Sequence, residues 1–334
     1  VSPSPPIPTG VCGSSGTDTG SGSESTEHKA YSTEHKAHST EHRAYSTKHS
    51  MDYPEEIKHE LHSRVKTFFS DSGFQKLQDS FVIVVGLGGV GSHCSNMLVR
   101  SGVGHVRLID FDQVTLSSLN RHALASMADV GSSKAEVLRR RLLEVVPWCR
   151  VEAVCRMFRE EDAEMLLLGE WDQGPSGAAQ SRGMGQGSQV RRPCMVVDAI
   201  DDISTKAQLL AFCLQHDIPV VTSMGAGGKA DPTKLRIAPL SDCINDPLAQ
   251  KLRWKLKKQH NLDCSLLGDK LTAVYSAEKP VVDLLPLQQE QKDDPQQYGA
   301  VDFLRIRVMP VLGTSPGSFG QALAAYVMCT LASG

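Results

Sequence analysis

The apolar residues of this chain fall into short runs that alternate with segments of helical character. Phe81–Val85 is a continuous run of aromatic and β-branched residues, which is typical of a strand buried on both faces. Four more runs have the composition of strands: Val106–Ile109, Val151–Cys155, Met195–Asp198 and Ile218–Val221. Helices are predicted over residues 53–78, Ser92–Arg100, Lys134–Val146 and Lys206–Gln215. This alternation predicts an α/β fold with a doubly wound, mainly parallel sheet of the Rossmann type.

Beyond Gly225 the alternation becomes less regular. Strands are predicted at Lys234–Ile237, Thr272–Ser276 and Phe303–Val308, and helices at Pro247–Gln259 and Phe319–Leu331. The proline- and acid-rich stretch Lys279–Gln297 is predicted to be a loop. We therefore expect one α/β domain over residues 51–334, with residues 230–334 as its C-terminal extension.

Two segments lack this pattern. Residues 1–50 are mainly serine, proline, glycine and threonine at first, and then contain a heptapeptide, Ser25–Tyr31, that recurs from Ser32 and Ser39. Too few apolar side chains are present to offset the entropy of ordering, so we predict disorder. The alternative is metal binding by the histidines of the repeat, which are His28, His35, His42 and His49. Residues 171–193 are rich in glycine, serine and glutamine and are predicted to be a flexible surface insertion.

The composition limits the class of protein. Apolar residues make up 40% of the 334 residues, and the net charge of −3 gives no global field for a nucleic-acid partner, although a local basic patch would suffice. Nine scattered cysteines with no C-x-x-C pair argue against a disulfide framework and against a structural zinc. Neither a signal peptide nor an apolar run of about 18 residues is found, so we predict a cytoplasmic location.

A glycine-rich loop, Gly86-Leu87-Gly88-Gly89-Val90-Gly91, directly follows the strand Phe81–Val85 and precedes a helix. In a G-x-G-x-x-G loop of this kind, backbone N–H groups and the helix N-terminus face phosphate groups. Asp110 ends the next strand, where a carboxylate is suited to bind the ribose hydroxyls of a nucleotide. These features predict a nucleotide site but do not distinguish NAD from ATP.

Two cationic residues beyond Asp110 favour ATP. Arg121 follows Leu119-Asn120, and Lys134 closes the stretch Val130–Lys134. Hydride transfer needs no cations at the phosphates, whereas negative charge develops on phosphate oxygens during nucleotidyl transfer. The structural alternatives are a surface ion pair for Arg121 and a solvated helix start for Lys134. An NAD-dependent oxidoreductase is one functional alternative, and it would leave Arg121 and Lys134 without a role. A non-catalytic nucleotide scaffold is another, but none of the groups expected on the phosphate side is missing.

The fourth predicted strand ends in Asp198-Ala199-Ile200-Asp201. The carboxyl ends of strands in open α/β sheets border the ligand crevice, where a carboxylate can hold Mg²⁺ against triphosphate oxygens. Asp201 is the preferred magnesium ligand. For Asp198, capping of the next helix is an equally good interpretation.

These motifs together resemble the ubiquitin-activating-enzyme-like superfamily, which includes the ThiF and MoeB adenylyltransferases. Within it, the chain looks most similar to the tRNA threonylcarbamoyladenosine dehydratases, especially their fungal branch. The further stretches that carry this resemblance are Ser117–His122, Ser223–Ala226, Asp231–Lys234, Asp246–Ala249, Ser276–Pro280 and Pro310–Thr314. They extend the resemblance from about residue 55 to about residue 332.

The resemblance implies a role for each matching position. The nucleotide would contact glycines of the loop and polar residues beyond it: Gly86, Gly88, Gly89, Gly91, Asp110, Asp112, Ser118, Asn120, Arg121 and Lys134. Catalysis would involve Arg121, Lys134, Asp201 and Arg64, with Asp201 on Mg²⁺. Arg64 matches an arginine that reaches into the partner subunit's site, so the resemblance also implies a homodimer.

The chain departs from its relatives at two positions and lacks one motif that some of them carry. Ser118 stands where many superfamily members have asparagine, which shortens the reach of the side chain. Ala273 stands where bacterial dehydratases often carry a cysteine, so a thiol intermediate is not expected. Cys243 is interpreted as an ordinary loop or buried cysteine. The missing C-x-x-C pairs separate the chain from zinc-bearing relatives.

The reaction that the resemblance implies is ATP-dependent cyclisation of threonylcarbamoyladenosine beside the anticodon of tRNA. The basic helix from Lys251 onward, with Trp254 among its lysines, suits an RNA backbone and a stacked base. An adenylyltransferase that activates the C-terminus of a ubiquitin-like or sulfur-carrier protein is the alternative, but no such partner is expected here. By family analogy, the cytosolic face of the mitochondrial outer membrane is an alternative location.

Overall fold

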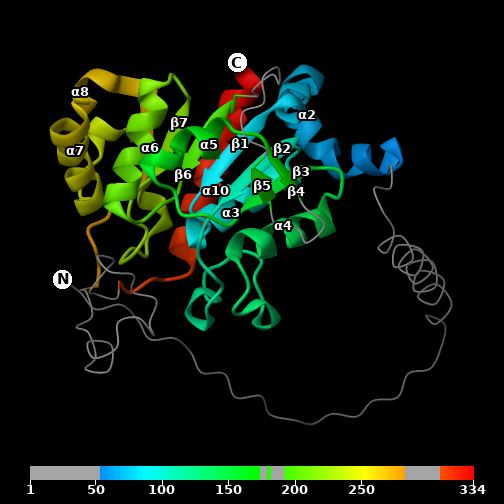
Figure 1. The fold of residues 1–334 in the computed structure, drawn as a ribbon, viewed down its shortest axis with the longest axis horizontal. Helices are drawn as coiled ribbons and strands as arrows, with labels where there is room; N and C mark the ends of the chain where they lie inside the picture. Colours follow the sequence, from blue (N-terminus) through cyan, green and yellow to red (C-terminus); the bar gives the residue numbers. More distant parts are fainter. Residues whose placement is uncertain (1–52, 174–178, 182–191, 283–308) are drawn as a thin grey trace, which may run out of the picture. The chain divides into compact units, whose positions relative to one another are not determined.

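The computed structural model describes residues 53–173, 179–181, 192–282 and 309–334. The chain divides into two units, residues 1–52 and 53–334, and only the second is described (Figure 1). The predicted disorder of residues 1–50 and the repeat histidines lie outside the described residues, as does the predicted strand Phe303–Val308. Among the described helices, none has the length and apolar character needed to cross a membrane.

A seven-stranded sheet forms the centre of the second unit, with strand order β3-β2-β1-β6-β7-β9-β8. Its strands are β1 (Phe81–Val85), β2 (His105–Ile109), β3 (Arg150–Val154), β6 (Met195–Asp198), β7 (Val220–Ser223), β8 (Leu235–Pro239) and β9 (Leu271–Ser276). Neighbouring strands are parallel except for β8, which pairs with β9 in the antiparallel sense. The predicted doubly wound, mainly parallel sheet is confirmed.

Helices cover both faces of the sheet, as Figure 1 shows. They are α2 (Glu55–Asp79), α3 (Gly89–Arg100), α4 (Lys134–Val145), α5 (Ala163–Leu168), α6 (Ile203–Gln215), α7 (Pro247–His260), α8 (Cys264–Leu267) and α10 (Thr314–Ser333). The short helix α5 was not predicted from the sequence. The helix predicted over residues 53–78 is confirmed as α2, which is interrupted at Ser70 by a positive φ of 67°.

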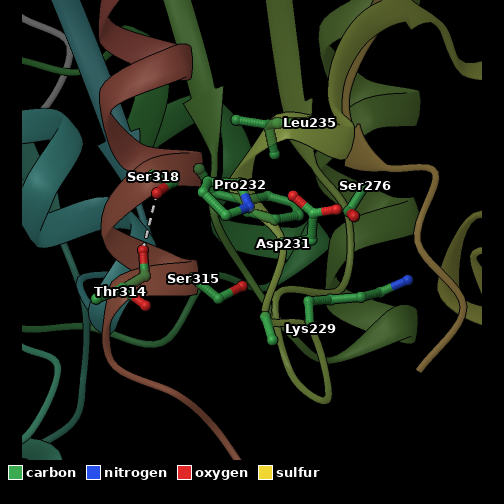
Figure 2. Close-up of a pocket in the computed structure, with 10 residues that line it drawn as sticks. Lys229, Asp231, Pro232, Leu235, Ser276, Thr314, Ser315 and Ser318 are labelled. Carbon is green, nitrogen blue, oxygen red and sulfur yellow. Dashed lines mark hydrogen bonds between the residues drawn. The ribbon is translucent and has the colours of Figure 1, made fainter. Parts of the chain in front are cut away.

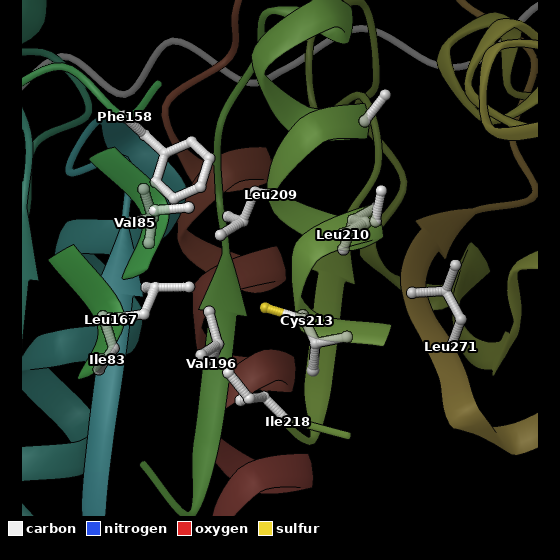
Figure 3. Packing of buried hydrophobic residues seen from close by; sticks show 14 of the residues in the cluster. Ile83, Val85, Phe158, Leu167, Val196, Leu209, Leu210, Cys213, Ile218 and Leu271 are labelled. Carbon is white, nitrogen blue, oxygen red and sulfur yellow. The ribbon is translucent and has the colours of Figure 1, made fainter. Parts of the chain in front are cut away.

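Alternate residues of each strand enter two separate cores. Phe81, Ile83 and Val85 of β1 pack in the cluster that includes α5, α6 and α7. Val82 and Val84 pack on the opposite face, against α3, α4 and α10. Figure 3 shows the first core, where side chains of β1 and β6 face those of α6. Because a strand directs successive side chains to opposite faces, a continuous apolar run is what this three-layer arrangement requires.

Two short parts of the predicted insertion at residues 171–193 form a second sheet. Strands β4 (Trp171–Gln173) and β5 (Ala179–Ser181) pair in the antiparallel sense. Trp171 is only 3% exposed and belongs to the apolar core. Its Nε1–H donates to the carbonyl oxygen of Met165 at 3.2 Å. The prediction of a wholly flexible surface segment is therefore wrong at its first residue, because a buried tryptophan anchors it.

The strand order reverses between β1 and β6, which leaves a crevice at their carboxyl ends. Gly86 follows β1 there, and its N–H donates to the carbonyl oxygen of Ile109 at 2.9 Å. Ala199 follows β6, and its N–H donates to the carbonyl oxygen of Val85, also at 2.9 Å. These bonds extend the sheet and bring the loops after β1, β2 and β6 to one edge.

Candidate functional site

The glycine loop lies at this edge, between β1 and the N-terminus of α3. Gly86 has a φ of +88°, a conformation that side-chain-bearing residues rarely adopt. A Cβ at Gly91 would lie 1.8 Å from the carbonyl oxygen of Gly86, so the loop closes only with glycine there. A Cβ at Gly88, by contrast, would meet nothing within 4 Å. The backbone therefore packs tightly beneath the loop and borders open space at Gly88, as a phosphate cradle requires.

The first amides of α3 have no acceptors within the helix, as in every α-helix, and no acidic side chain occupies its first turn. The helix N-terminus also carries partial positive charge. The loop and helix together suit an anionic ligand. The structure thus provides the geometry expected of a nucleotide loop, while the contacts predicted for Gly86, Gly88, Gly89 and Gly91 stay predictions.

Asp110 connects the end of β2 to the glycine loop. Its Oδ2 accepts the N–H of Leu87 at 2.6 Å, and its Oδ1 accepts the N–H of Asp112 at 2.8 Å. Burial raises the pKa of this carboxyl group, while the nearby charge of Lys134 acts to lower it. Each carboxylate oxygen retains a further lone-pair site. Asp110 therefore fixes the loop and can still accept hydrogen bonds from a ribose.

Lys134 begins α4 and faces the segment after β2. Its Nζ lies 2.7 Å from Oδ2 of Asp112, and its backbone N–H donates to the Asp112 carbonyl oxygen at 3.0 Å. The Lys134 side chain is 12% exposed, whereas that of Asp112 is 48% exposed. The largely buried Lys134 side chain is thus held in place by Asp112, whose carboxylate is more exposed to solvent than the lysine. This arrangement positions the ammonium group at the edge that carries the glycine loop.

Arg121 lies against the glycine loop from the other side. A Cβ at Gly89 would be 3.3 Å from the Cγ of Arg121. The guanidinium NH1 donates to the carbonyl oxygen of Ser117 at 2.6 Å and to Oδ1 of Asn120 at 3.0 Å. In this conformation NH1 of Arg121 is bound to its own turn.

The turn that carries Arg121 is hydrogen-bonded to α3 and packs closely against the C-terminal extension. Ser92 accepts the N–H of Ala123 at 3.0 Å on its Oγ, and Gly313 passes so close that a Cβ there would lie 2.4 Å from the Asn120 carbonyl oxygen. Ser118 is buried, donates its hydroxyl to the Thr115 carbonyl oxygen at 2.7 Å and accepts the Thr115 N–H at 3.0 Å. Its hydroxyl already serves this turn, and its predicted contact with nucleotide stays a prediction.

The three carboxylates at the end of β6, which are Asp198, Asp201 and Asp202, have different surroundings and different roles. Asp198 is fully buried and accepts from Nζ of Lys206 at 2.6 Å and from the Thr222 hydroxyl at 2.6 Å. Asp202 is the residue that caps α6, since its Oδ2 accepts the Thr205 N–H at 2.8 Å. The capping interpretation of Asp198 is therefore wrong. Asp201 is exposed beside it, at the crevice edge, and remains the carboxylate suited to a metal.

Sequence reasoning missed two buried groups at this edge. Lys206 lies on the apolar face of α6 and is fully buried, and a lysine between Thr205 and Ala207 in an otherwise apolar helix was a usable signal. His122 directly follows Arg121 and is 7% exposed. Its Nδ1 accepts the backbone N–H groups of Leu124 at 3.3 Å and Ala125 at 3.0 Å. Nothing in the sequence alone distinguished it from a surface histidine.

Cys243 and Cys264 are protected thiols, whereas Cys155, which lies beside Ser133, is exposed. Cys243 is 3% exposed, and burial raises its pKa to about 12. Cys264 is 6% exposed, and burial raises its pKa as well. Ala273 is fully buried in β9. The interpretation of Cys243 as a buried cysteine is confirmed.

A small pocket opens at the same edge, between β9 and the start of α10 (Figure 2). Because β9 is parallel to β7, its last residue, Ser276, lies at the carboxyl edge of the sheet. Polar side chains line the pocket, among them Lys229, Asp231, Ser276, Thr314, Ser315 and Ser318. Ser315 donates its hydroxyl to the Ala226 carbonyl oxygen at 2.8 Å, which ties α10 to the loop after β7. The pocket extends the crevice beyond the glycine loop with hydrogen-bonding groups.

Arg64 lies exposed on α2. Four residues spaced by three or four positions form one stripe along this helix, namely Ile57, Leu61, Arg64 and Phe68. The three apolar members are 37%, 41% and 77% exposed, in chain order. The role predicted for Arg64 in a partner subunit stays a prediction.

Comparisons with known proteins agree with this geometry. The ThiF family model matches residues 61–332. tRNA threonylcarbamoyladenosine dehydratase 2 of Saccharomyces cerevisiae is 39% identical over 285 residues, which cover 84% of this chain and 58% of that protein. The Bacillus subtilis tRNA threonylcarbamoyladenosine dehydratase is 33% identical over 220 residues, which cover 66% of this chain and 76% of that protein.

A solved structure is also similar. Escherichia coli tRNA N6-threonylcarbamoyladenosine dehydratase in complex with ATP aligns with a TM-score of 0.65 at 27% identity, over 82% of this chain and 95% of that one. The chain spans 58% of the length of the two yeast dehydratases that it matches. From the family match and these similarities, the chain belongs to the ThiF family, in the branch of the tRNA threonylcarbamoyladenosine dehydratases.

Proposed function

We propose that this chain uses ATP to activate the free carboxylate of N6-threonylcarbamoyladenosine in tRNA, so that the modification closes to its cyclic form with net loss of water. The observation that supports this most is the grouping of Lys134 and Arg121 around the glycine loop at the reversal point of the sheet. The relatives are named for this dehydration, and one was solved with ATP. Mass spectrometry of tRNA nucleosides, before and after incubation with the protein, tests the proposal.

The residues of the chain have distinct tasks in this proposal. The backbone at Gly88 would receive phosphate oxygens, and Asp110 would orient the ribose. Lys134 and Arg121 would neutralise charge that develops as the carboxylate oxygen attacks the nucleotide. The activated carboxyl and the carbamoyl group belong to one bound nucleotide, so ring closure is intramolecular and gains from proximity.

No protein nucleophile is needed for this sequence of steps. Cys243 and Cys264 are buried with raised pKa values, and position 273 carries alanine. These features support direct ring closure rather than a thioester. They also weigh against the alternative, an adenylyltransferase that would pass a ubiquitin-like protein to a thiol.

The donor set at the crevice fits Mg²⁺. This ion is usually held by one or two carboxylates, with phosphate oxygens and water completing six positions. Asp201 supplies an exposed carboxylate at the edge, and Asp198 lies fully buried, against Lys206 and Thr222. Among the described residues, no cluster of three metal-binding side chains exists. Mg²⁺ held by Asp201 would offset phosphate charge.

A homodimer is part of the proposal. The stripe of Ile57, Leu61 and Phe68 exposes apolar surface on both sides of Arg64. A second copy that covered this stripe would bury the apolar residues and carry Arg64 toward its partner.

All cysteines in the described part of the chain are free thiols, which supports a reducing, cytoplasmic location.

We assign tRNA contact to one face of α7. Lys251, Trp254 and Lys258 lie at positions i, i+3 and i+7 of the helix, and all three are exposed. Leu252 and Leu256 are fully buried on the opposite face. The Trp254 side chain is 62% exposed, which is unusual for so large an apolar group. An aromatic ring between two lysines suits a stacked base beside an RNA backbone.

The start of α7 also lies at the crevice. A Cβ at Gly225, two residues beyond β7, would be 3.7 Å from Oδ2 of Asp246, the residue that caps α7. The helix therefore begins at the carboxyl edge of the sheet, and the residues of its exposed basic face follow along it. This direction would let an RNA bound on α7 present its modified base to the crevice.

Trp254→Ala is expected to weaken tRNA binding by about 1–3 kcal/mol, the contribution of one stacked base. Fluorescence anisotropy with labelled tRNA at fixed salt concentration measures it. Leu266→Ala is the matched control, since Leu266 is 84% exposed and has no aromatic ring. Equal tRNA affinities for the two variants would show that α7 does not stack an RNA base.

A further inference from the structure

Lys229, in the loop after β7, is a buried cation that joins three segments of the chain. It is only 4% exposed. Its Nζ donates to the carbonyl oxygen of Asn245 at 3.4 Å and to the carbonyl oxygen of Glu278. In Figure 2 the Lys229 side chain extends away from α10. Since Asn245 precedes α7 and Glu278 follows β9, one ammonium group connects the loop after β7 to both of these elements.

Further hydrogen bonds connect the same three segments. Nδ2 of Asn245 donates to the carbonyl oxygen of Ala277 at 2.8 Å. Oε2 of Glu278 accepts the N–H groups of the two residues that follow Lys229, at 2.9 and 3.0 Å. We call these contacts of Lys229, Asn245 and Glu278 the Lys229 network. It fixes the ends of β7 and β9 and the start of α7 against one another.

The start of α7 depends on this network through Asn245. This residue has a φ of +55°, a left-handed conformation that asparagine adopts more readily than most residues. It directly precedes Asp246, whose Oδ1 accepts the Ala249 N–H at 2.9 Å and so caps α7. Burial raises the pKa of the Asp246 carboxyl group, and the charge of Lys229 acts in the opposite direction. Lys229 thus supports both the backbone before α7 and the charge balance at its cap.

We propose that Lys229 is a positioning residue for the reaction on tRNA. It would fix the start of α7 at the carboxyl edge of the sheet, so that an RNA bound on the basic face of α7 presents its modified base in register with the nucleotide. This inference rests on the proposed function and on the α7 contact with tRNA. Lys229 itself touches no substrate in this role, because its ammonium group is held by backbone carbonyl oxygens.

Placement of the base has a large effect on rate but a small effect on affinity. Reacting atoms must be held close to the geometry of attack, and a displacement of about 1 Å can cost about 100-fold in rate. The lysines and Trp254 of α7 would still bind RNA if the start of the helix shifted, and the glycine loop would still bind ATP. A positioning role therefore predicts slow conversion with nearly normal binding of both substrates.

Two variants weaken the network at different points. Lys229→Met removes the ammonium group and keeps an unbranched side chain of nearly the same length. Asn245→Gly removes the bond to Ala277, and glycine adopts the positive φ at this position without strain. Lys234→Met is the matched control, because Lys234 lies in the same segment but its side chain is 51% exposed and pairs with Asp231 at 3.5 Å.

Conversion is measured as a single-turnover rate with modified tRNA and saturating ATP, and the Kd values for ATP and for tRNA are measured by fluorescence. We expect Lys229→Met to lower the rate about 10- to 100-fold. Both Kd values should stay within about threefold of the wild type. Asn245→Gly should show the same split with a smaller loss of rate, and Lys234→Met should match the wild type. Circular dichroism establishes that each variant is folded, and Asn245→Gly decides the question if Lys229→Met does not fold.

The other outcomes overturn the proposal in distinct ways. A wild-type rate in the folded Lys229→Met variant would mean that the network has no part in placing the base. A weaker tRNA affinity with an unchanged rate would make Lys229 a support of RNA binding only. Equal losses in rate and in both affinities would show general destabilisation of the crevice. If the wild-type protein converts no tRNA base, the proposed function itself fails.

Discussion

Lys134→Ala is expected to lower kcat/KM for ATP-dependent conversion of the tRNA base about 100- to 1,000-fold, the effect of removing one preorganised charge from a transition state. Lys134 lies at the edge that carries the glycine loop, and its side chain is only 12% exposed. Its partner Asp112 is half exposed, so the ion pair contributes little to folding stability after solvent screening. The variant should remain folded and lose mainly catalytic power. Steady-state kinetics with modified tRNA measures the change.

Lys58→Ala is the matched control for this experiment. Lys58 also pairs with a carboxylate, Glu55, at 2.7 Å, but it lies in the first turn of α2. Its loss should leave turnover unchanged. Turnover by Lys134→Ala at the wild-type rate would instead exclude Lys134 from the phosphate site.

Lys206→Met is expected to destabilise the fold by about 3–5 kcal/mol, the usual cost of leaving one member of a buried ion pair alone. Lys206 and Asp198 are both fully buried, 2.6 Å apart, and Nζ also donates to Thr222 at 3.1 Å. Without the lysine, the Asp198 carboxylate has no countercharge in this network. Urea denaturation measures the loss as a lower midpoint at an unchanged m-value.

This pair also supports the loop that carries Asp201. Oδ1 of Asp198 accepts the N–H of Ile200 at 3.1 Å, so the network fixes the backbone next to the proposed metal ligand. Lys257→Met is the control, because Lys257 pairs with Asp263 at 2.7 Å on the surface. It should unfold at nearly the wild-type urea concentration. An equal midpoint for Lys206→Met would contradict the importance of the buried pair.

The central part of the fold was predictable because its signals are local. A continuous apolar run such as Phe81–Val85 has few interpretations once a glycine loop follows it. Asp110 directly follows the next apolar run, so the sequence alone places it at the carboxyl end of a strand. The alternation of strands with helices likewise predicted a mainly parallel sheet before any contact was known.

The rest depended on contacts between distant segments. Lys206 and Asp198 lie eight positions apart, yet Thr222 completes their network from a third element. The burial of Trp171 in a core reached by a surface insertion has no periodic signal. The burial of His122 depends on the turn that follows it, in which Nδ1 accepts two backbone N–H groups. Such features require the fold, because sequence spacing does not record which polar group meets which.

The identity of the proposed substrate comes from the family resemblance, because neither the residue patterns nor the geometry of the site provides it directly. The carboxylate of threonylcarbamoyladenosine cannot be inferred from Lys134 or Arg121, which would serve any adenylation. Buried Cys243 and alanine at position 273 show only that these two positions offer no accessible thiol. The exposed basic face of α7 is consistent with the proposed contact with RNA, which rests mainly on the relatives.

The central claim is tested most directly by mass spectrometry of nucleosides from tRNA that carries threonylcarbamoyladenosine. The tRNA is incubated with the protein, ATP and Mg²⁺, and digested under conditions that preserve the cyclic product. We predict that the threonylcarbamoyladenosine signal falls and that a species lighter by one water appears, only when ATP is present. An unchanged threonylcarbamoyladenosine signal, with a folded protein that binds ATP, would contradict the proposed function.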